Sequence, residues 1–488
     1  MESFKLFING QFESGAATFD SLDPATGQPW ATIAEARAEE VNRAVEAAQR
    51  AFNAPEWRDL TASARGKLLM RLADLVERNA EELARLETLD TGKIIRETRA
   101  QIAYVAEYYR YYAGLADKME GRVLSIDKAD TETWTRREPV GVVAAIVPWN
   151  SQLFLSAVKI GPALAAGCTL VVKAAESAPT PLLAFARLIA EAGFPPGVCN
   201  VITGFGDRCG TVLTTHPDVA HIAFTGGPET ARHIVRNSAE NLSKTTLELG
   251  GKSPFIVFDD ADLESAANAQ VAAIFAASGQ SCVAGSRLLV AESIKERFLA
   301  TLVERVQRIV IGAPQEMATQ FGPLCTQQQK TRVQTLVARS LEQGARLLTG
   351  HYDIDRPGYY YPPTILDCSD TPHAESVVNE LFGPVLSVVS FRDEADAIRL
   401  ANDTAYGLAA GVFTQNLARA HRVTRALRSG VVWINTYRMV SPLAPFGGYR
   451  LSGHGREGGM EAALEFTTTK TVWLRTSDEP IGDPFVMR

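Results

Sequence analysis

Short apolar runs that alternate with helical stretches dominate the middle of the chain. Four of them follow one another between Val140 and Gly227: VGVVAAIVPW, CTLVVKAAE, VCNVITGFG and HIAFTGG. SPFIVFDD and SRLLVAE come after Glu248, and LSVVSF and GVVWIN follow later. Short buried strands joined by helices are typical of parallel β-α-β units. The sequence therefore predicts an α/β protein with two such lobes in succession, without an internal repeat or a low-complexity linker.

The segment before these runs is mostly helical in pattern. Asn9-Gly10 is a hairpin signal near the start of the chain. Residues 38–91 carry leucines at helical spacing, and Gly92 lies just beyond their end. A second helix is predicted from Arg96 to Met119.

Two segments fit neither lobe. Residues 120–139 are polar and read as a two-stranded arm, and residues 463–475 (ALEFTTTKTVWLR) are rich in β-forming residues. Unpaired strand edges are a liability, so strands of this kind usually find a partner. We expect the two segments to form a small third unit used for self-association.

The composition restricts the classes of function. A length of 488 residues suggests about three domains. With 22% charged residues, a net charge of -7 and no long basic run, a nucleic-acid or anionic-membrane surface is disfavoured. The start of the chain lacks the apolar core of a signal peptide, and the most apolar run, residues 140–149, is too short to span a bilayer. We expect a cytoplasmic protein that binds neither nucleic acid nor membrane.

One of the six cysteines stands in an unusual context. None of the six has zinc-site spacing, so no metal is expected. A structural cysteine is usually wedged among larger apolar residues. Cys282, in the stretch ASGQSCVAGSR, instead has small or polar neighbours. Either the chain turns tightly there, or its backbone approaches a ligand.

Polar residues and glycines gather where the predicted strands end. Asn150 follows the first run, Lys173 and Glu176 the second, and Gly227 the fourth. Because parallel sheets bind ligands at the carboxyl ends of their strands, we expect these residues to meet. Each signal is weak alone, since loop residues are usually solvated.

Two further strand ends differ in how much they indicate about function. GFGDRCG is only a partial dinucleotide fingerprint, because Cys209 stands where the third glycine belongs. Glu248 lies beside apolar and glycine residues. A carboxylate in such surroundings has a raised pKa, which suits a general base.

Taken in order, the motifs resemble one family over essentially the whole chain. They are VPWN, VVKAAE, FTGG, LELGGKSP, GQSCVAGSR, ELFGPV, VWIN and PFGGYRLSGHGREGG. They resemble the aldehyde dehydrogenase superfamily in its hydrolytic, NAD(P)-dependent form. The resemblance implies a Rossmann-like NAD-binding domain over residues 1–119 and 140–249 and an α/β catalytic domain over 250–449. It also implies a small β oligomerisation arm over 120–139 and 463–488, with 450–462 returning to the NAD-binding side, in a homodimer or homotetramer.

The resemblance also implies a reaction, the oxidation of an aldehyde to its carboxylic acid. Cys282 would be the nucleophile, forming a thiohemiacetal and then a thioester. Asn150 and the N–H of Cys282 would hold the oxyanion. Glu248 would activate the water that releases the acid. Relatives that pass the acyl group to coenzyme A do not use such a base, so Glu248 favours water.

The implied cofactor is NAD, with NADP as a weaker possibility. Lys173 and Glu176 match the pair that holds the adenosine ribose, and the carboxylate would repel a ribose phosphate. The segment GGPETA departs from the commoner family pattern, because it lacks a serine after the first glycine and ends in Ala231. The predicted cofactor-binding residues are Pro148, Trp149, Lys173, Glu176, Gly206, Gly227, Leu249, Glu380 and Phe382.

The resemblance gives the substrate tunnel as a set of positions. They are Tyr104, Ser151, Phe154, Leu155, Val158, Ala276, Ser281, Val283, Arg438, Val440 and Phe446. Ser151, Val158 and Ala276 are small where relatives acting on small aldehydes are often aromatic, which predicts a wide tunnel. Arg438 falls at the expected mouth. It would bind a carboxylate, an amide or another polar group, or else face solvent or a subunit interface.

The hypothesis for the substrate is a bulky or polar catabolic aldehyde, derived from an aromatic compound or a heterocycle. The alternatives are a betaine- or amino-aldehyde dehydrogenase, a semialdehyde dehydrogenase, a coenzyme A-acylating enzyme, and a binding protein on a retired scaffold. Glu248 disfavours coenzyme A as acceptor. The presence of Cys282, Glu248 and Asn150 together disfavours a retired scaffold.

Overall fold

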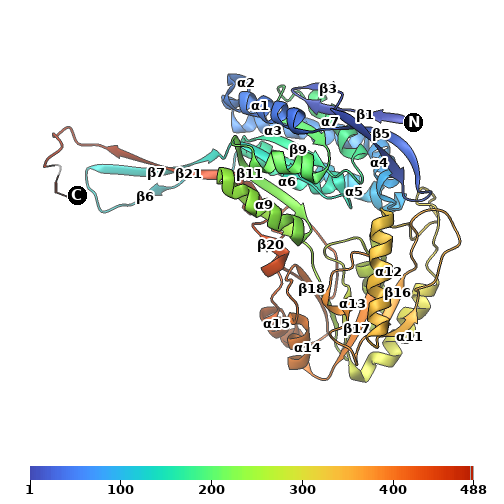
Figure 1. Ribbon diagram of the computed structural model, residues 1–488. Helices are drawn as coiled ribbons and strands as arrows, with labels where there is room; N and C mark the ends of the chain where they lie inside the picture. The colour runs from blue at the N-terminus through green and yellow to red at the C-terminus, as the bar shows by residue number, and fades with distance from the viewer. Residues whose placement is uncertain (484, 487–488) are drawn as a thin grey trace.

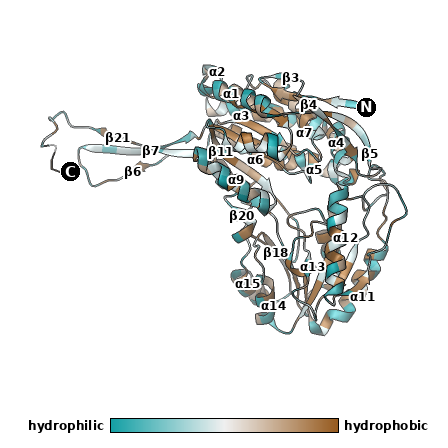
Figure 2. Cartoon of the chain, viewed as in Figure 1, coloured by the Kyte–Doolittle hydropathy of each residue, from teal (hydrophilic) through white to brown (hydrophobic). Residues whose placement is uncertain are grey.

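The computed structural model describes residues 1–483 and 485–486 and shows two lobes and a projecting arm (Figure 1). Hydrophobic residues concentrate on the strands and helix faces inside the two lobes (Figure 2). The mixed α/β class predicted from the sequence is confirmed. None of the helices in the described part of the chain is long and apolar enough to cross a membrane.

The first lobe is built on an eight-stranded sheet. Its centre is five parallel strands in the order β12 (Lys244–Leu249), β11 (Val219–Gly226), β8 (Val142–Ile146), β9 (Thr169–Ala174) and β10 (Cys199–Thr203). β20 (Gly453–His454) adds antiparallel to β12, and the hairpin β2 (Leu6–Ile8) and β3 (Gln11–Glu13) adds beyond β10. The central strands are buried along almost their whole length, which explains their continuous apolar runs.

Helices cover both faces of this sheet. The connections contain α6 (Gln152–Ala166), α7 (Thr180–Glu191), α8 (Thr211–Thr215) and α9 (Pro228–Asn241). The region predicted as helical between residues 38 and 91 is four helices: α1 (Ala38–Asn53), α2 (Pro55–Arg58), α3 (Ala62–Arg78) and α4 (Ala80–Thr91). Proline begins α2, and the left-handed Gly92 ends α4. The second predicted helix is α5 (Ile95–Leu115).

A three-stranded sheet at the N-terminus was not predicted. It consists of β1 (Glu2–Phe4), β5 (Gln28–Glu35) and β4 (Ala17–Asp23). β4 alternates between partly buried and exposed positions and has few large apolar residues. Such a strand has a much weaker sequence signal than one buried on both faces.

The second lobe has a seven-stranded sheet. Its order is β15 (Arg346–Thr349), β16 (Thr364–Asp367), β17 (Val385–Phe391), β14 (Arg287–Ala291), β13 (Pro254–Val257), β18 (Ala409–Phe413) and β19 (Val431–Ile434). Only β15 is antiparallel to its neighbour. The helices of this lobe are α10 (Leu263–Phe275), α11 (Lys295–Gln307), α12 (Gln327–Glu342), α13 (Glu375–Val378), α14 (Glu394–Asn402) and α15 (Leu417–Ala426).

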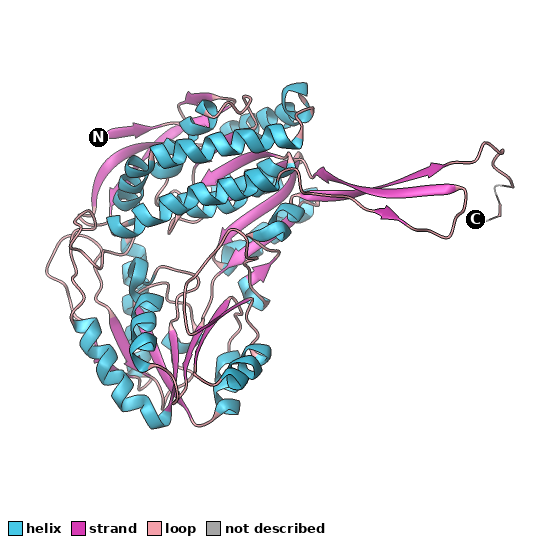
Figure 3. Ribbon diagram, turned by 180° about the vertical axis from the view of Figure 1, so that it is seen from behind, coloured by secondary structure: helices cyan, strands magenta, loops and turns pink. Residues whose placement is uncertain are grey.

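The two segments that fit neither lobe form one three-stranded sheet, the arm. β21 (Thr467–Arg475) pairs antiparallel with β7 (Thr131–Pro139) over nine positions, and β6 (Val123–Leu124) pairs with the other edge of β7. The arm extends far from both lobes (Figures 1 and 3). The strand begins at Thr467 rather than at 463, because α16 (Gly459–Glu465) precedes it. Three residues of the predicted arm, Pro484, Met487 and Arg488, lie outside the described residues.

Candidate active site

A cavity of about 460 Å³ lies where the two lobes face each other. Its walls come from α5 and the start of α6, from the end of β12, and from the loops before β14 and after β19. The three predicted catalytic residues and all predicted tunnel positions line it: Cys282, Glu248, Asn150, Tyr104, Ser151, Phe154, Leu155, Val158, Ala276, Ser281, Val283, Arg438, Val440 and Phe446. Residues scattered along more than 300 positions of sequence thus share one cavity.

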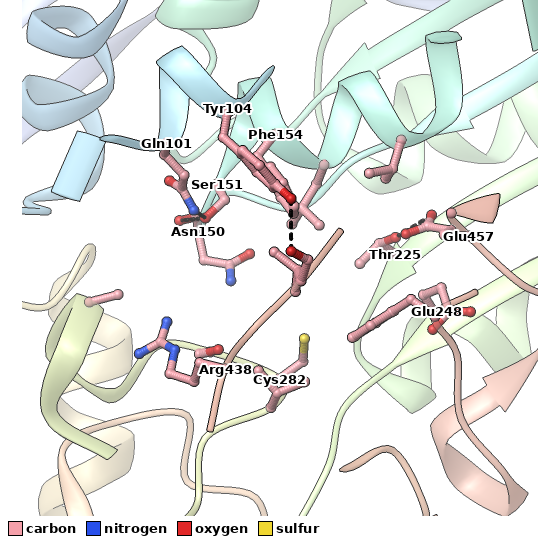
Figure 4. Close-up of a pocket in the computed structure, with 18 of the residues that line it drawn as sticks. Gln101, Tyr104, Asn150, Ser151, Phe154, Thr225, Glu248, Cys282, Arg438 and Glu457 are labelled. Atoms are coloured by element: carbon pink, nitrogen blue, oxygen red, sulfur yellow. Dashed lines mark hydrogen bonds between the residues drawn. The ribbon is translucent and has the colours of Figure 1, made fainter. Parts of the chain in front are cut away.

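Cys282 lies in the loop between α10 and β14, and its thiol points into the cavity (Figure 4). The other five cysteines are buried, whereas Cys282 is partly exposed. Burial, and after it the negative charges of Glu380, Glu248 and Glu457, raise the pKa of the Cys282 thiol to about 12. Arg438 acts in the opposite direction. The thiol is therefore protonated at neutral pH and needs a base to become a nucleophile.

The backbone before Cys282 has an unusual conformation. Ala277 and Ser278 have φ values of 51° and 52°, and Gly279 has φ 75°. Left-handed backbone at residues with a Cβ stores strain and marks functional sites. A Cβ on Gly279 would lie 2.3 Å from the backbone carbon of Gly383, so only glycine fits. The small residues around Cys282 thus permit a tight turn against a neighbouring backbone.

Asn150 lies just before α6, where β8 has ended. Its side chain is buried, and Nδ2 donates a hydrogen bond to the carbonyl oxygen of Gln280 at 3.0 Å. That bond ties the asparagine amide to the loop that carries Cys282. In Figure 4 the thiol lies between Asn150 on one side and Glu248 on the other.

Glu248 is near the carboxyl end of β12 and is 3% exposed. Neither of its carboxylate oxygens has a hydrogen-bond partner among the described residues. Burial raises the pKa of Glu248 well above its usual range, and the nearby carboxylate of Glu457 raises it further. A buried, unpaired carboxylate with a raised pKa is a good candidate for a general base.

A buried ion pair next to Glu248 was not predicted. Lys159 of α6 pairs with Glu457, and Lys159 Nζ also donates to Thr225 Oγ1 at 2.7 Å. Thr225 Oγ1 lies 3.4 Å from a Glu457 oxygen (Figure 4). One signal was present in the sequence: Lys159 is the single charged residue of residues 152–166. A buried charge in such a stretch requires a partner.

A second polar cluster, also not predicted, lines the cavity beside Ser151. Lys93 is 3% exposed, and its Nζ lies 3.1 Å from a Glu87 oxygen and 3.0 Å from Ser151 Oγ. It also donates to Gln101 Oε1. Gln101 Nε2 in turn donates to Ser151 Oγ at 3.2 Å (Figure 4). We refer to Lys93, Gln101 and Ser151 as the Gln101 cluster.

Arg438 lines the cavity from the loop after β19, with its backbone at φ 62°. Side chains hold this loop on both sides of the arginine: Tyr437 Oη donates to the Val283 carbonyl, Trp433 Nε1 to that of Met439, and Tyr104 Oη to that of Val440. The guanidinium donates one bond, at 3.1 Å, to the carbonyl of Ala272. It forms no ion pair with a described residue. The loop therefore presents a cation with unused donors at the cavity.

The predicted cofactor residues lie mostly at the carboxyl ends of the first sheet, and Glu380 and Phe382 come from the second lobe between α13 and β17. Lys173 Nζ lies 3.1 Å from a Glu176 oxygen. Trp149, which follows Pro148 after β8, packs edge-on against Phe382 with ring centroids 5.3 Å apart. Glu380 accepts a hydrogen bond from the Gly251 N–H at 3.0 Å. Leu249 lines the same cavity as Cys282.

Two glycines test whether a dinucleotide fits this region. Gly227 caps the 14-residue helix α9, and a Cβ added there would meet nothing within 4 Å. Gly206, at the start of a short π-helical turn after β10, is equally open. A helix N-terminus with free space offers N–H donors to a pyrophosphate. A Lys–Glu pair offers ribose hydroxyls both a hydrogen-bond donor and a hydrogen-bond acceptor. The donor set fits NAD.

Comparisons with known proteins give a consistent result. The model of the Aldehyde dehydrogenase family matches residues 12–472. The chain is 71% identical, over all 488 residues and the full length of both chains, to (Z)-2-((N-methylformamido)methylene)-5-hydroxybutyrolactone dehydrogenase of Acinetobacter baylyi. It also superposes on the NAD+ complex of an aldehyde dehydrogenase from Bacillus cereus, with TM-score 0.96, 42% identity and coverage of 98% and 97% of the two chains. Betaine aldehyde dehydrogenase from Staphylococcus aureus in complex with NAD+ gives TM-score 0.97 at 39% identity, covering 100% and 97%.

Proposed function

The chain belongs to the aldehyde dehydrogenase family, whose members oxidise aldehydes with NAD(P), and we propose that its substrate is an oxo acid bearing an amide. The resemblance of highest identity described above, to a hydroxybutyrolactone dehydrogenase over full length, motivates this choice. A 5-hydroxybutyrolactone is the ring-closed form of a 4-oxo acid. Opening the ring frees an aldehyde and a carboxylic acid without adding or removing any atom, and the acid ionises to a carboxylate at neutral pH.

Arg438 is the observation that carries the proposal. An open 4-oxo acid brings a carboxylate into the cavity, and burying it requires a partner. Arg438 lines the cavity, its guanidinium has donors without an acceptor among the described residues, and its loop is fixed by three side-chain hydrogen bonds. An arginine can bind a carboxylate through two parallel bonds, which also hold the chain open. The same charge opposes a cationic substrate such as betaine aldehyde.

We assign the chemistry to Cys282, Asn150 and Glu248. The Cys282 thiol gives up its proton to solvent as the sulfur bonds to the aldehyde carbon, so Glu248 stays ionised for the later step. The resulting oxyanion is held by the Asn150 amide and the Cys282 N–H, each of which is worth about 3 kcal/mol of barrier. When bound, NAD accepts the hydride that leaves this carbon. A thioester on Cys282 then remains, and Glu248 removes a proton from the water that attacks it.

The overall reaction consumes aldehyde, water and oxidised cofactor, and it gives a carboxylate, reduced cofactor and two protons. For the proposed substrate the product is a dicarboxylate, which cannot close to the hydroxylactone again. Lys173 and Glu176 would hold the adenosine ribose, and the carboxylate disfavours a phosphate there, so we propose NAD rather than NADP. Gly206 and Gly227 would approach the pyrophosphate, and Pro148, Trp149, Leu249, Glu380 and Phe382 would surround the nicotinamide half.

We also propose a role for each domain. Residues 1–119 and 140–249 would bind the cofactor, residues 250–449 would carry the nucleophile, and 120–139 with 463–488 would join subunits. Support for the last role comes from the arm, whose edge strand β21 exposes Trp473 at 62%. Pairing with a second copy would cover that edge in a homodimer or homotetramer. We also propose a cytoplasmic location, consistent with six free cysteines.

Replacing Arg438 by methionine tests the proposed substrate class. Two aldehydes of equal chain length, 4-oxobutanoate and butanal, differ in the carboxylate. We expect Arg438→Met to lower kcat/KM for 4-oxobutanoate by about 10- to 100-fold, as for loss of a charged hydrogen bond. The value for butanal should change less than about twofold. Arg399→Met, an exposed site that pairs with Asp396, is the control.

An equal loss for both aldehydes would contradict the carboxylate role of Arg438, as would no loss for either. The same assay with coenzyme A present identifies the acyl acceptor. Free acid as the sole product supports water, whereas an acyl-coenzyme A product would overturn the role given to Glu248.

A further inference from the structure

We propose that the Gln101 cluster is a second substrate subsite, which binds the carbonyl oxygen of a neutral amide. This inference rests on the proposed function, since it concerns the part of the substrate that Arg438 does not bind. The cluster lines the same cavity as Cys282 and Arg438 but belongs to the other lobe: Lys93 lies between α4 and α5, Gln101 on α5, and Ser151 just before α6. Figure 4 shows Gln101 and Ser151 together at the cavity wall beside Asn150.

The Gln101 cluster and Arg438 present different net charges to the cavity. The Lys93 ammonium is compensated by Glu87, whose side chain is fully buried. Glu97, which also lines the cavity, adds a further negative charge on α5, the helix that carries Gln101. A substrate anion would therefore gain little near the Gln101 cluster. The unpaired Arg438 attracts the anion instead. A substrate carboxylate is therefore favoured at Arg438, and a neutral polar group at the Gln101 cluster.

Counting donors identifies the atom that is free to bind. The three N–H groups of Lys93 are directed to Glu87, Gln101 and Ser151. The Ser151 hydroxyl donates to the Asn150 carbonyl at 2.6 Å. Gln101 accepts from Lys93 through Oε1 and donates one Nε2 hydrogen to Ser151. Its second Nε2 hydrogen has no acceptor among the described residues, so the cluster offers one oriented donor.

An amide carbonyl is the complement of this donor. The lysine fixes the orientation of the Gln101 amide, because Nζ requires the oxygen of that amide as its partner. The donor is therefore preorganised, which reduces the entropy lost on binding. Ser151 is short, and it leaves room near Asn150 for a substituent close to the reacting carbon. An N-formyl or N-acyl group on an oxo acid matches this position and polarity.

Two hydroxylactones, one with and one without the amidomethylene substituent, provide the test. One is (Z)-2-((N-methylformamido)methylene)-5-hydroxybutyrolactone, and the other is unsubstituted 5-hydroxybutyrolactone. We expect Gln101→Leu to lower kcat/KM for the amide-bearing compound by about 5- to 30-fold, the range for losing one oriented donor at a buried acceptor. The value for the unsubstituted compound should stay within about twofold. Gln328→Leu, an exposed glutamine on α12, is the matched control.

A second variant, Gln101→Glu, distinguishes loss of the hydrogen-bond donor from loss of side-chain packing at position 101. It keeps the size of the side chain and the acceptor for Lys93 but removes the donor. The added negative charge weakens both carboxylate-bearing substrates alike, so the expected result is a larger loss of kcat/KM for the amide-bearing compound than for the unsubstituted one. An equal loss for both lactones with either variant would show a structural role and overturn the subsite, and so would no loss for either. The proposed function is judged separately: Arg438→Met must reduce turnover of both lactones, since both open to a carboxylate, whatever Gln101 does.

Discussion

The backbone N–H of Ala277 donates to both carboxylate oxygens of Glu97, at 3.0 and 3.1 Å. This contact joins α5 of the first lobe to the left-handed turn that precedes Cys282. The turn has two strained residues, Ala277 and Ser278, and Ser278 is anchored separately by a bond from Oγ to the Gly322 carbonyl at 2.9 Å. Glu97 therefore acts as a positioning residue for the nucleophile, from a helix far away in sequence.

Replacing Glu97 by glutamine should impair the presentation of the thiol. The neutral side chain loses a charge-assisted bond, which is stronger than a neutral one by about 1 kcal/mol or more. We expect kcat to fall about 5- to 10-fold with KM little changed, and the rate of Cys282 alkylation by iodoacetamide to change in parallel. Glu107→Gln on the exposed side of α5 is the control. Unchanged alkylation and turnover in Glu97→Gln would show that the turn holds without this contact.

The pH dependence of turnover should report the environment of Glu248. The base must be ionised, and burial together with Glu457 raises its pKa well above the usual range of a glutamate. Activity should therefore rise with pH along a limb well above about pH 4.3, the ordinary value. Glu457→Gln removes a negative neighbour and leaves Lys159 uncompensated, and both changes favour ionised Glu248.

In the Glu457→Gln variant, the acid limb of the kcat–pH profile should move to lower pH. Measuring kcat at saturating substrate over a range of pH values would show this shift. Glu461→Gln, an exposed carboxylate on α16, should leave the limb in place. A shift to higher pH, or a limb unaffected by Glu457→Gln, would contradict the electrostatic coupling of the two carboxylates.

Stability should also depend on pH, through His221. This residue is buried on β11, its Nε2 lies 2.9 Å from Thr246 Oγ1, and burial lowers its pKa to about 3. In the unfolded chain its pKa is about 6.5, so the unfolded state binds the proton first and stability falls as pH drops from about 6.5 toward 3. Between pH 7 and 5 the loss is about 2 kcal/mol.

Urea unfolding of His221→Gln at these two pH values checks this number. The variant should lose about 2 kcal/mol less than the wild type over the same interval. Buried Asp90, whose pKa is raised to about 6 by burial, acts in the opposite direction in both proteins, so the comparison isolates the histidine. An exposed histidine, His233, provides the control through His233→Gln. Equal pH dependence in wild type and His221→Gln would contradict the assignment.

Most central strands of the two sheets could be predicted because they are buried and therefore form continuous apolar runs. β15, β16, β18 and β20 were not among the predicted runs. The ends of the predicted strands then singled out Asn150 and Glu248, and the small neighbours of Cys282 marked it as a candidate for a reactive thiol, the role that the family resemblance implied. These three residues line one cavity, as their positions at strand ends and in a glycine-rich loop suggested.

Other parts of the site had no local signal. Lys93, Glu97 and Gln101 lie at the end of one helix and on the next, among other charged residues, and only tertiary packing brings them to the cavity. The left-handed backbone at Ala277 and Ser278 is imposed by long-range contacts, since neither residue favours that conformation. The N-terminal sheet was missed for a similar reason, because its strands are partly exposed and gain their pairing from distant partners.

Trapping the acyl enzyme tests the central claim, that the aldehyde is oxidised while bonded to Cys282. Glu248→Gln should transfer hydride but hydrolyse the thioester slowly, by a factor of about 10² to 10⁴. Mixed with NAD and 4-oxobutanoate, it should release a burst of one NADH per site and retain the acyl group on the peptide that contains Cys282, as seen by mass spectrometry. A burst without an adduct on Cys282, or steady turnover by Cys282→Ala, would contradict the account.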